Sequence, residues 1–258
     1  MSTVLFQIDS NVAIITLNRP DKLNAFNREM ALLLQQQLDE CANQQEVRCV
    51  YITGAGKGFS AGQDLAEIVA ADAPTMTQIL SEHYNPIIER IRKLPKPVIA
   101  AVNGVAAGAG ANIALSCDIV IAAQAASFIQ AFSKLGLIPD SGGTYFLPRL
   151  IGWQKASALA MLGDKISAEE AERMGMIYKV MAGDGFASAT LQLAKQVAQM
   201  PTQGLALTKQ ALNQSFTNNY QQQLALEDQL QQQAALTDDY KEGVSAFLEK
   251  RAPQFTGK

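Results

Sequence analysis

The hydrophobic positions in the first two thirds of the chain predict strands that alternate with helices. Residues 4–9 and 12–17 are rich in β-branched and aromatic side chains, and Ser10-Asn11 between them predicts a hairpin turn. Three further apolar runs predict strands over residues 47–53, 97–102 and 119–123. Helical stretches and glycine loops separate these strands, which is typical of a parallel sheet with helical crossovers. We therefore expect an α/β fold.

The first helix is predicted to begin after Asn27, whose side chain suits an N-cap position. Apolar residues then recur three and four positions apart, as one face of a helix requires. These residues are Met30, Leu33, Leu34, Leu38 and Cys41.

The pattern changes after Trp153, where strand signals nearly vanish. Residues 167–170 form a capping-box sequence, which opens a helix expected to stop at Gly175. Three or four more amphipathic helices are predicted over residues 186–247. No sequence repeat is visible within the chain.

We expect two regions, an α/β core over residues 1–190 and a helical region over residues 191–258. A helical segment that follows an α/β body often packs on neighbouring subunits, so an oligomer is expected.

Composition narrows the classes of function. The chain has 258 residues, 48% hydrophobic and 17% charged, which suffices to bury a large core. A net charge of −3 and scattered cationic residues disfavour nucleic-acid binding. No stretch approaches the ~20 uncharged apolar residues of a membrane span, and the N-terminus lacks a signal-peptide pattern. We expect a cytoplasmic protein with no membrane partner.

The cysteines and the single histidine do not indicate a metal site. Cys41, Cys49 and Cys117 show no C-x-x-C spacing and are expected to be buried thiols. His83 lies in a polar stretch, and a catalytic triad would have to be built around it alone, so a catalytic role for it is disfavoured. We predict no metal and no cofactor.

Two glycine-rich loops follow predicted strands, where ligands collect in α/β sheets. In residues 59–65 the small residues allow close backbone approach, and the N–H of Gln63 could face a site; the alternative is a turn that caps a helix near Asp64. Residues 103–112 open a helix whose free N–H groups favour an oxyanion, whereas the alternative is tight helix–sheet packing. A dinucleotide fingerprint fails because Ile113 stands where its third glycine belongs.

A third segment, residues 136–144, holds one carboxylate, Asp140, in a stiff turn. The segment is a good β-turn sequence on its own. The functional alternative is a general base beside an apolar pocket lined by Phe132, Leu137 and Ile138, where burial would make the carboxylate a better base. No second catalytic carboxylate is evident.

Together these segments resemble the crotonase superfamily of enoyl-CoA hydratases and isomerases, over nearly the whole chain. The order and spacing of the matching pieces carry the resemblance. They are residues 17–20, 23–26, 59–65, 96–100, 103–112, 136–144 and 242–251. The resemblance implies a crotonase-like β/α spiral core with a C-terminal helical oligomerisation region, packed as a homotrimer or a dimer of trimers. It implies an acyl-CoA substrate, with coenzyme A present only as part of that substrate.

The resemblance also assigns roles to residues. Family members hold the thioester oxygen with two backbone N–H groups, which correspond here to Gln63 and Ala109. Positions that match the coenzyme A surface are Lys22, Ala25, Ala61, Asp64, Leu65, Phe247 and Lys250. Positions that match the acyl pocket are Asn112, Phe132 and Leu137.

One departure from the family pattern decides the expected reaction. Hydratases of this family activate water with two glutamates, and Asn112 and Phe132 occupy those positions here. Asp140 matches the acidic residue of several non-hydratase members. We therefore expect an acyl-CoA isomerase in which Asp140 moves a proton, either along a 3-enoyl chain or on an epoxidised aromatic ring. A 2-enoyl-CoA hydratase and a non-catalytic acyl-CoA-binding subunit are the alternatives.

Overall fold

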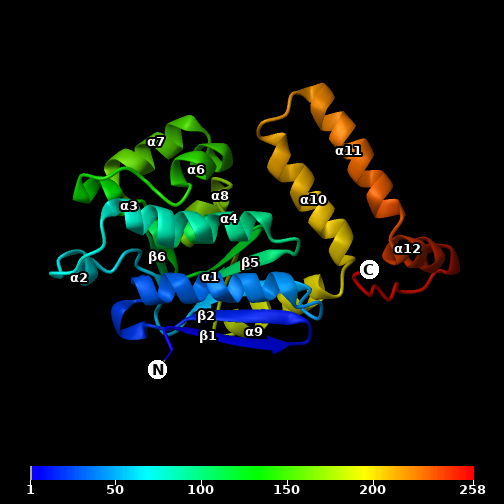
Figure 1. Ribbon diagram of the computed structural model, residues 1–258, viewed down its shortest axis with the longest axis horizontal. Coiled ribbons are helices and arrows are strands. Elements are labelled where there is room, and N and C mark those ends of the chain that lie inside the picture. The colour runs from blue at the N-terminus through cyan, green and yellow to red at the C-terminus, as the bar shows by residue number, and fades with distance from the viewer. Residues whose placement is uncertain (1) are drawn as a thin grey trace.

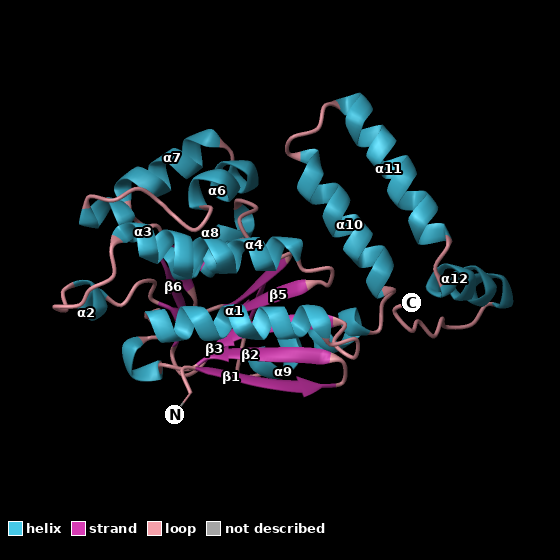
Figure 2. Cartoon of the chain, viewed as in Figure 1, coloured by secondary structure: helices cyan, strands magenta, loops and turns pink. Residues whose placement is uncertain are grey.

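The computed structural model describes residues 2–258, and the strands in this part of the chain form two sheets (Figures 1 and 2). The larger sheet has the order β1-β2-β3-β5-β7-β10. Its strands are Val4–Asp9, Val12–Leu17, Cys49–Gly54, Val98–Val102, Ile119–Ala123 and Lys179–Met181. Only β1 and β2 pair antiparallel; the other neighbours are parallel. The predicted hairpin is confirmed, and Ser10 and Asn11 both have positive φ, as a tight hairpin turn requires.

The smaller sheet arises because each central strand is followed by a short second strand. It has the order β4-β6-β8-β9, with strands Gly58–Ser60, Val105–Ala107, Ser127–Ile129 and Lys165–Ser167. β4 follows β3, β6 follows β5 and β8 follows β7, so the chain winds through both sheets once per turn. This pairing of a long strand with a short one recurs three times in the structure, although no repeat is visible in the sequence.

The central strands of the larger sheet are buried on both faces, because helices cover both sides of the sheet. On β2, Ala13 and Ile15 belong to the main core with α1, whereas Val12 and Ile14 pack against α9. The helices are α1 Arg28–Asn43, α2 Leu65–Ile68, α3 Met76–Gln78, α4 Asn85–Lys93, α5 Ala109–Leu115, α6 Gly143–Ile151, α7 Trp153–Leu162, α8 Ala168–Arg173, α9 Phe186–Ala198, α10 Thr202–Ser215, α11 Tyr220–Ala235 and α12 Asp238–Glu249. No helix within residues 2–258 has the length and apolar character needed to cross a membrane.

Several helix predictions are confirmed in detail. The Asn27 side chain accepts the N–H of Met30, as an N-cap does. Ser167 likewise caps α8, whose last residue is Arg173, and Gly175 directly after the C-cap Met174 has a φ of +81°, as predicted for the glycine that ends this helix. The expectation that strands nearly vanish after Trp153 is wrong for β9 and β10, which are three residues each. Strands this short show no alternation that a sequence could reveal.

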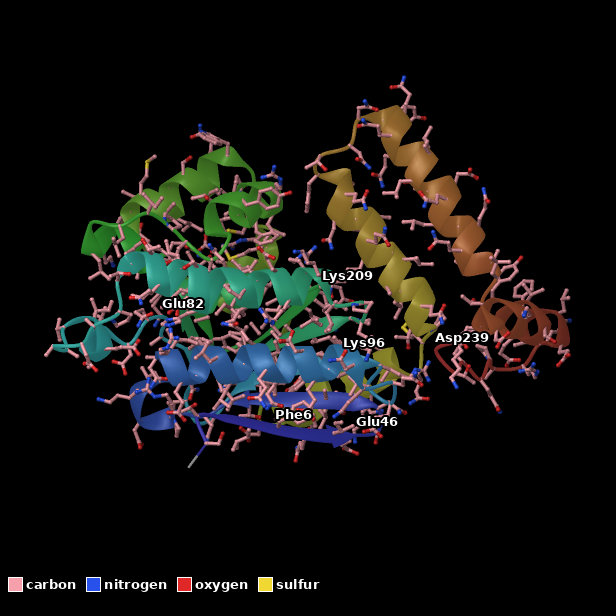
Figure 3. The ribbon with its side chains drawn as sticks, viewed as in Figure 1. Phe6, Glu46, Glu82, Lys96, Lys209 and Asp239 are labelled. Atoms are coloured by element: carbon pink, nitrogen blue, oxygen red, sulfur yellow. The ribbon has the colours of Figure 1, made fainter. Side chains whose placement is uncertain are left out.

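Helices α10, α11 and α12 form an arm that stands away from the two sheets (Figure 1). Arg48 fastens the base of this arm: its guanidinium donates to Thr202 Oγ1 (2.9 Å), the Met200 carbonyl (2.7 Å) and the Phe255 carbonyl (2.9 Å). Lys96 of the core and Lys209 of α10 lie close together (Figure 3). Lys209 Nζ donates a hydrogen bond of 3.2 Å to the Lys96 carbonyl. A cavity of about 860 Å³ remains between α10 and the core.

The boundary expected at residue 190 falls inside α9, which packs on the larger sheet, and the arm begins at α10. The division into a core over 1–190 and a helical region over 191–258 remains a prediction.

Candidate functional site

Two backbone segments that follow neighbouring short strands come into direct contact. Gly62 follows β4 and has a φ of +88°, and a Cβ built on it would lie 2.8 Å from the Ala107 carbonyl oxygen and 3.5 Å from the Ala109 nitrogen. An L side chain is strained at this φ and has no space here. Glycine at position 62 therefore allows the segment that carries Gln63 to reach the start of α5.

The backbone of Gln63 is oriented by pairing with Phe26. Phe26 N donates to the Gly62 carbonyl (2.7 Å), and Asp64 N donates to the Phe26 carbonyl (2.8 Å). In a parallel bridge of this kind, the residue between the two bonded neighbours points its own N–H and C=O away from the partner strand. The Gln63 N–H is therefore directed away from Phe26.

Ala109 is the first residue of α5, after Gly108 with a φ of +51°. The first N–H groups of a helix have no carbonyl one turn back to bond, so the Ala109 N–H is free for a ligand. The loop also packs tightly at Gly110, the next residue, because a Cβ there would lie 2.6 Å from Ser60 Oγ. The tight packing suggested by the sequence of this glycine loop is therefore present, and the oxyanion role of the Ala109 N–H stays a prediction.

Asp140 lies in a turn that other side chains hold in place. Ser141 and Gly142 follow it with φ of +51° and +75°. The Asn112 amide donates to the Asp140 carbonyl oxygen at 2.8 Å, and the Gln130 amide donates to Asn112 Oδ1 at 2.8 Å. Asn112 is fully buried, so one of the residues assigned to the acyl pocket supports the backbone of the turn that carries Asp140.

The environment of Asp140 favours a proton-accepting role. Burial raises the pKa of its carboxyl above the ordinary value, and the hydrogen bond that Ser141 Oγ donates to Oδ1 (2.8 Å) offsets this only in part. The Asp140 charge in turn contributes to raising the pKa of the Tyr84 hydroxyl, after burial as the main cause.

The proposed acyl wall is buried at one end and open at the other. Phe132 is buried, and its ring tip would be 3.7 Å from a Cβ on Gly108. Leu137 is exposed, and Ile138 is 79% exposed. Within this chain, Phe132 is thus the deep apolar residue next to the Gly108–Ala109 turn.

Comparison with known proteins places this geometry in a family. A family model described as enoyl-CoA hydratase/isomerase matches residues 7–258. The chain belongs to this family. A 1,2-epoxyphenylacetyl-CoA isomerase of Escherichia coli (strain K12) is 51% identical over 100% of both chains. A probable enoyl-CoA hydratase of Rhodobacter capsulatus is 43% identical over 99% of this chain and 98% of its own.

Solved structures of the family share the whole fold. A putative enoyl-CoA hydratase/isomerase from Mycobacterium abscessus is 36% identical, with a TM-score of 0.93 over 99% of this chain and 100% of that one. The expected crotonase-like α/β fold and the family resemblance are both confirmed, as is the expectation of an enzyme of this family.

Five of the seven residues assigned to coenzyme A belong to the Gln63 loop or to the segment just before Phe26, which pairs with Gln63. Lys22 and Leu65 are exposed, Ala25 is buried, and the Ala61 N–H donates to the Leu23 carbonyl at 2.9 Å. The Asp64 carboxylate is occupied within the chain, because Oδ2 pairs with Arg19 at 2.7 Å and Oδ1 accepts the Ala66 N–H at 3.1 Å. Asp64 therefore stabilises the Gln63 loop through its ion pair with Arg19, a residue to which the sequence assigned no role.

Phe247 and Lys250 are not near the rest of the site in this chain. They belong to the end of α12, and Figure 1 shows α12 and α2, which follows the Gln63 loop, at opposite ends of the molecule. Phe247 is 82% exposed. These two residues join such a site only if they come from another copy of the chain.

The structure also adds Tyr84, which sequence reasoning missed, and it shows the surroundings of His83. Tyr84 and His83 are both buried, at the end of a π-helix over Ile79–Tyr84. His83 faces Arg28, with Arg28 Nη1 3.1 Å from Nε2, and burial lowers the pKa of its ring. The period of a π-turn differs from that of an α-helix, so the local sequence pattern made this stretch look polar and exposed.

Proposed function

We propose that this protein is an acyl-CoA isomerase of phenylacetate breakdown. It converts ring-1,2-epoxyphenylacetyl-CoA to the ring-expanded oxepin-CoA, shifts a 3-enoyl-CoA double bond to the 2-position, or does both. The observation that carries the proposal is one partly buried carboxylate, Asp140, whose pKa is raised by desolvation, in a site whose two water-activating positions hold Asn112 and Phe132. The 51% identity to a protein named 1,2-epoxyphenylacetyl-CoA isomerase supports the substrate.

In the proposed mechanism, the N–H groups of Gln63 and Ala109 bind the thioester oxygen. Asp140 removes a proton from the carbon next to the carbonyl, and the electron pair moves onto the oxygen as an enolate. The protonated Asp140 then returns the proton to a more distant carbon. In the epoxide, the C–C bond shared by the two rings also breaks and its electrons become part of the double bonds of the seven-membered ring, so no atom is gained or lost. Charge develops on the oxygen only during the reaction, so the two amides lower the barrier more than they strengthen binding.

The test of this proposal is product analysis with the wild-type protein in ¹⁸O-labelled water. Three substrates are compared: ring-1,2-epoxyphenylacetyl-CoA, a 3-enoyl-CoA and a 2-enoyl-CoA. The proposal predicts products of unchanged mass from the first two and no rapid uptake of labelled water by the third. Rapid water addition would identify a hydratase. Hydration is the second candidate because the relative from Rhodobacter capsulatus is named a probable enoyl-CoA hydratase. All three thioesters bound but unchanged would identify a non-catalytic binding subunit.

We further propose that the protein acts as a homotrimer or a dimer of trimers in the cytoplasm. The arm exposes large apolar side chains, which a neighbouring copy would cover. They are Leu212, Phe216, Leu224, Leu236 and Leu248. A neighbouring copy would also supply Phe247 and Lys250 to the coenzyme A surface. Three buried free thiols, Cys41, Cys49 and Cys117, agree with a reducing compartment.

A further inference from the structure

The side chain of Gln63 takes part in a hydrogen-bond chain that connects its loop to two helices. Tyr84 Oη donates to Gln63 Oε1 at 2.7 Å. Gln63 Nε2 donates to Glu67 Oε2 at 2.8 Å, and Glu67 Oε1 accepts the N–H of Arg28, the first residue of α1, at 2.8 Å. Both ends of the Gln63 amide are therefore fixed, one by the π-helix that ends at Tyr84 and one through Glu67 by α1.

The direction of donation along this chain is set by chemistry. The Glu67 oxygens accept from the Gln63 amide and from a backbone N–H, as a carboxylate does. The amide nitrogen of Gln63 then faces Glu67, so its oxygen faces Tyr84 and needs a donor there. Burial and the nearby Asp140 charge raise the pKa of the Tyr84 hydroxyl well above its ordinary value, so it keeps the hydrogen that it donates.

A second contact ties Tyr84 to the same backbone. The rings of Tyr84 and Phe26 pack edge to face with centroids 6.0 Å apart, and Phe26 forms the bridge that orients the Gln63 backbone. Tyr84 is 1% exposed, so its ring cannot move without repacking the core. The residue that donates the candidate oxyanion N–H is thus held through its backbone by Phe26 and through its side chain by Tyr84 and Glu67.

We propose that Tyr84 and Glu67 are positioning residues, which fix Gln63 so that its backbone N–H points at the thioester oxygen. This inference rests on the proposed function, because it assigns the Gln63 N–H to that oxygen. Neither residue transfers a proton in this scheme. Their contribution is to the angle and distance of one hydrogen bond, where a displacement of about 1 Å can cost up to ~100-fold in rate.

The matched pair of variants is Tyr84→Phe and Tyr51→Phe. Each variant removes one buried hydroxyl and keeps the ring. Tyr51 is the control because its Oη bonds Thr190 Oγ1 at 2.8 Å on the opposite side of the larger sheet, against α9. We expect Tyr84→Phe and Glu67→Gln to lower kcat by about 10-fold or more with KM changed less than about twofold. Tyr51→Phe should leave kcat unchanged even if it unfolds at a lower temperature.

The deciding measurement is the infrared band of the thioester carbonyl in bound crotonyl-CoA labelled with ¹³C at that carbon. Wild-type protein and Tyr51→Phe should shift the band to lower wavenumber, and Tyr84→Phe and Glu67→Gln should shift it clearly less. In a Gln63→Met background, which keeps the backbone N–H but not the amide, Tyr84→Phe should have no further effect.

A full wild-type shift in Tyr84→Phe and Glu67→Gln would overturn the inference. If the wild-type protein gives no shift at all, the assignment of the Gln63 N–H is wrong and the inference fails with it. Neither result depends on turnover, so the isomerase proposal is judged separately by product analysis.

Discussion

At the scale of single residues, Asp140 has an environment that suits a base and disfavours its own charge. Burial opposes ionisation, while Ser141 and the turn held by Asn112 keep the carboxylate in one place. A base of raised pKa holds the abstracted proton more firmly, which brings its proton affinity nearer to that of the carbon it serves. The raised pKa of Asp140 leads to two testable predictions, one for the pH dependence of activity and one for stability.

The first prediction concerns the pH profile. Asp140 must be deprotonated to accept a proton, so activity is lost as pH falls through its pKa in the folded protein. Because burial raises that pKa, the acid limb of kcat/KM should lie above the range of an ordinary aspartate, whose pKa is ~3.9. Steady-state rates measured between pH 4 and 8 check this. An acid limb at the ordinary value would contradict the account of the Asp140 environment.

The second prediction concerns the free energy of unfolding. A carboxyl whose pKa is higher in the folded than in the unfolded state costs stability once pH rises through the folded pKa. Asp140→Asn keeps the shape and removes the charge, so it should raise the melting temperature at pH 7. The gain should be smaller at pH 4 than at pH 7, because a larger fraction of wild-type Asp140 is protonated at the lower pH. A variant that is less stable at both pH values would show that the charge is not disfavoured.

At the scale of elements, the site depends on how two loops approach each other rather than on side chains alone. The contact of Gly62 with Ala107 and Ala109 determines the distance between the two candidate N–H donors. Both loops follow short strands of the smaller sheet, so the pairing of β4 with β6 positions them.

The third prediction compares two glycines with nearly the same backbone conformation. Gly62 has φ of +88° and Gly183 +87°, but only Gly62 has a backbone atom against its missing Cβ, whereas nothing lies within 4 Å at Gly183. Gly183→Ala should cost about 1 kcal/mol of stability through backbone strain and leave kcat unchanged. Gly62→Ala should cost more and reduce kcat by ~100-fold or more, because the amide pair separates. Equal kinetics in the two variants would argue against this loop contact.

Much of the element order was predictable, because it depends on local chemistry. The hairpin, the Asn27 cap and the turn around Asp140 all follow from residues that are neighbours in the chain. Tyr84 was missed because its partner Gln63 is 21 residues away and the intervening π-helix breaks the expected period. The roles of Asp64 and Asn112 were equally hidden, since a sequence shows a polar side chain but not which neighbour satisfies it.

At the scale of the whole molecule, the arm of α10–α12 separates two parts of the proposed coenzyme A surface. Figure 1 shows α12 and α2, which follows the Gln63 loop, at opposite ends of the molecule, so Phe247 and Lys250 lie away from that loop within one chain. Asp239 fastens the tail beside α12, as Figure 3 indicates, by accepting the N–H groups of Thr256 (2.6 Å) and Gly257 (2.8 Å). The C-terminal tail is thus held against α12, and the proposed oligomer would use the arm as its contact with another copy.

The fourth prediction tests whether Lys250 acts on the site of a neighbour. Lys250→Ala should raise KM for an acyl-CoA by about 5- to 10-fold through the loss of one charge contact, with kcat nearly unchanged. Lys241→Ala, on the same helix and also exposed, is the control and should leave KM as it is. Light scattering of both variants checks that the oligomer persists. A monomeric wild-type protein with normal KM would contradict the shared site.

The central claim is that Asp140 alone moves the proton. The most direct measurement is the rate of double-bond migration in a 3-enoyl-CoA by Asp140→Asn, with the folded state verified by its melting temperature and by retained acyl-CoA binding. Removing a general base typically costs 10²- to 10⁴-fold, so we predict turnover reduced by ~100-fold or more with affinity for the thioester preserved. Undiminished turnover by the folded variant would remove Asp140 from the mechanism and contradict the account.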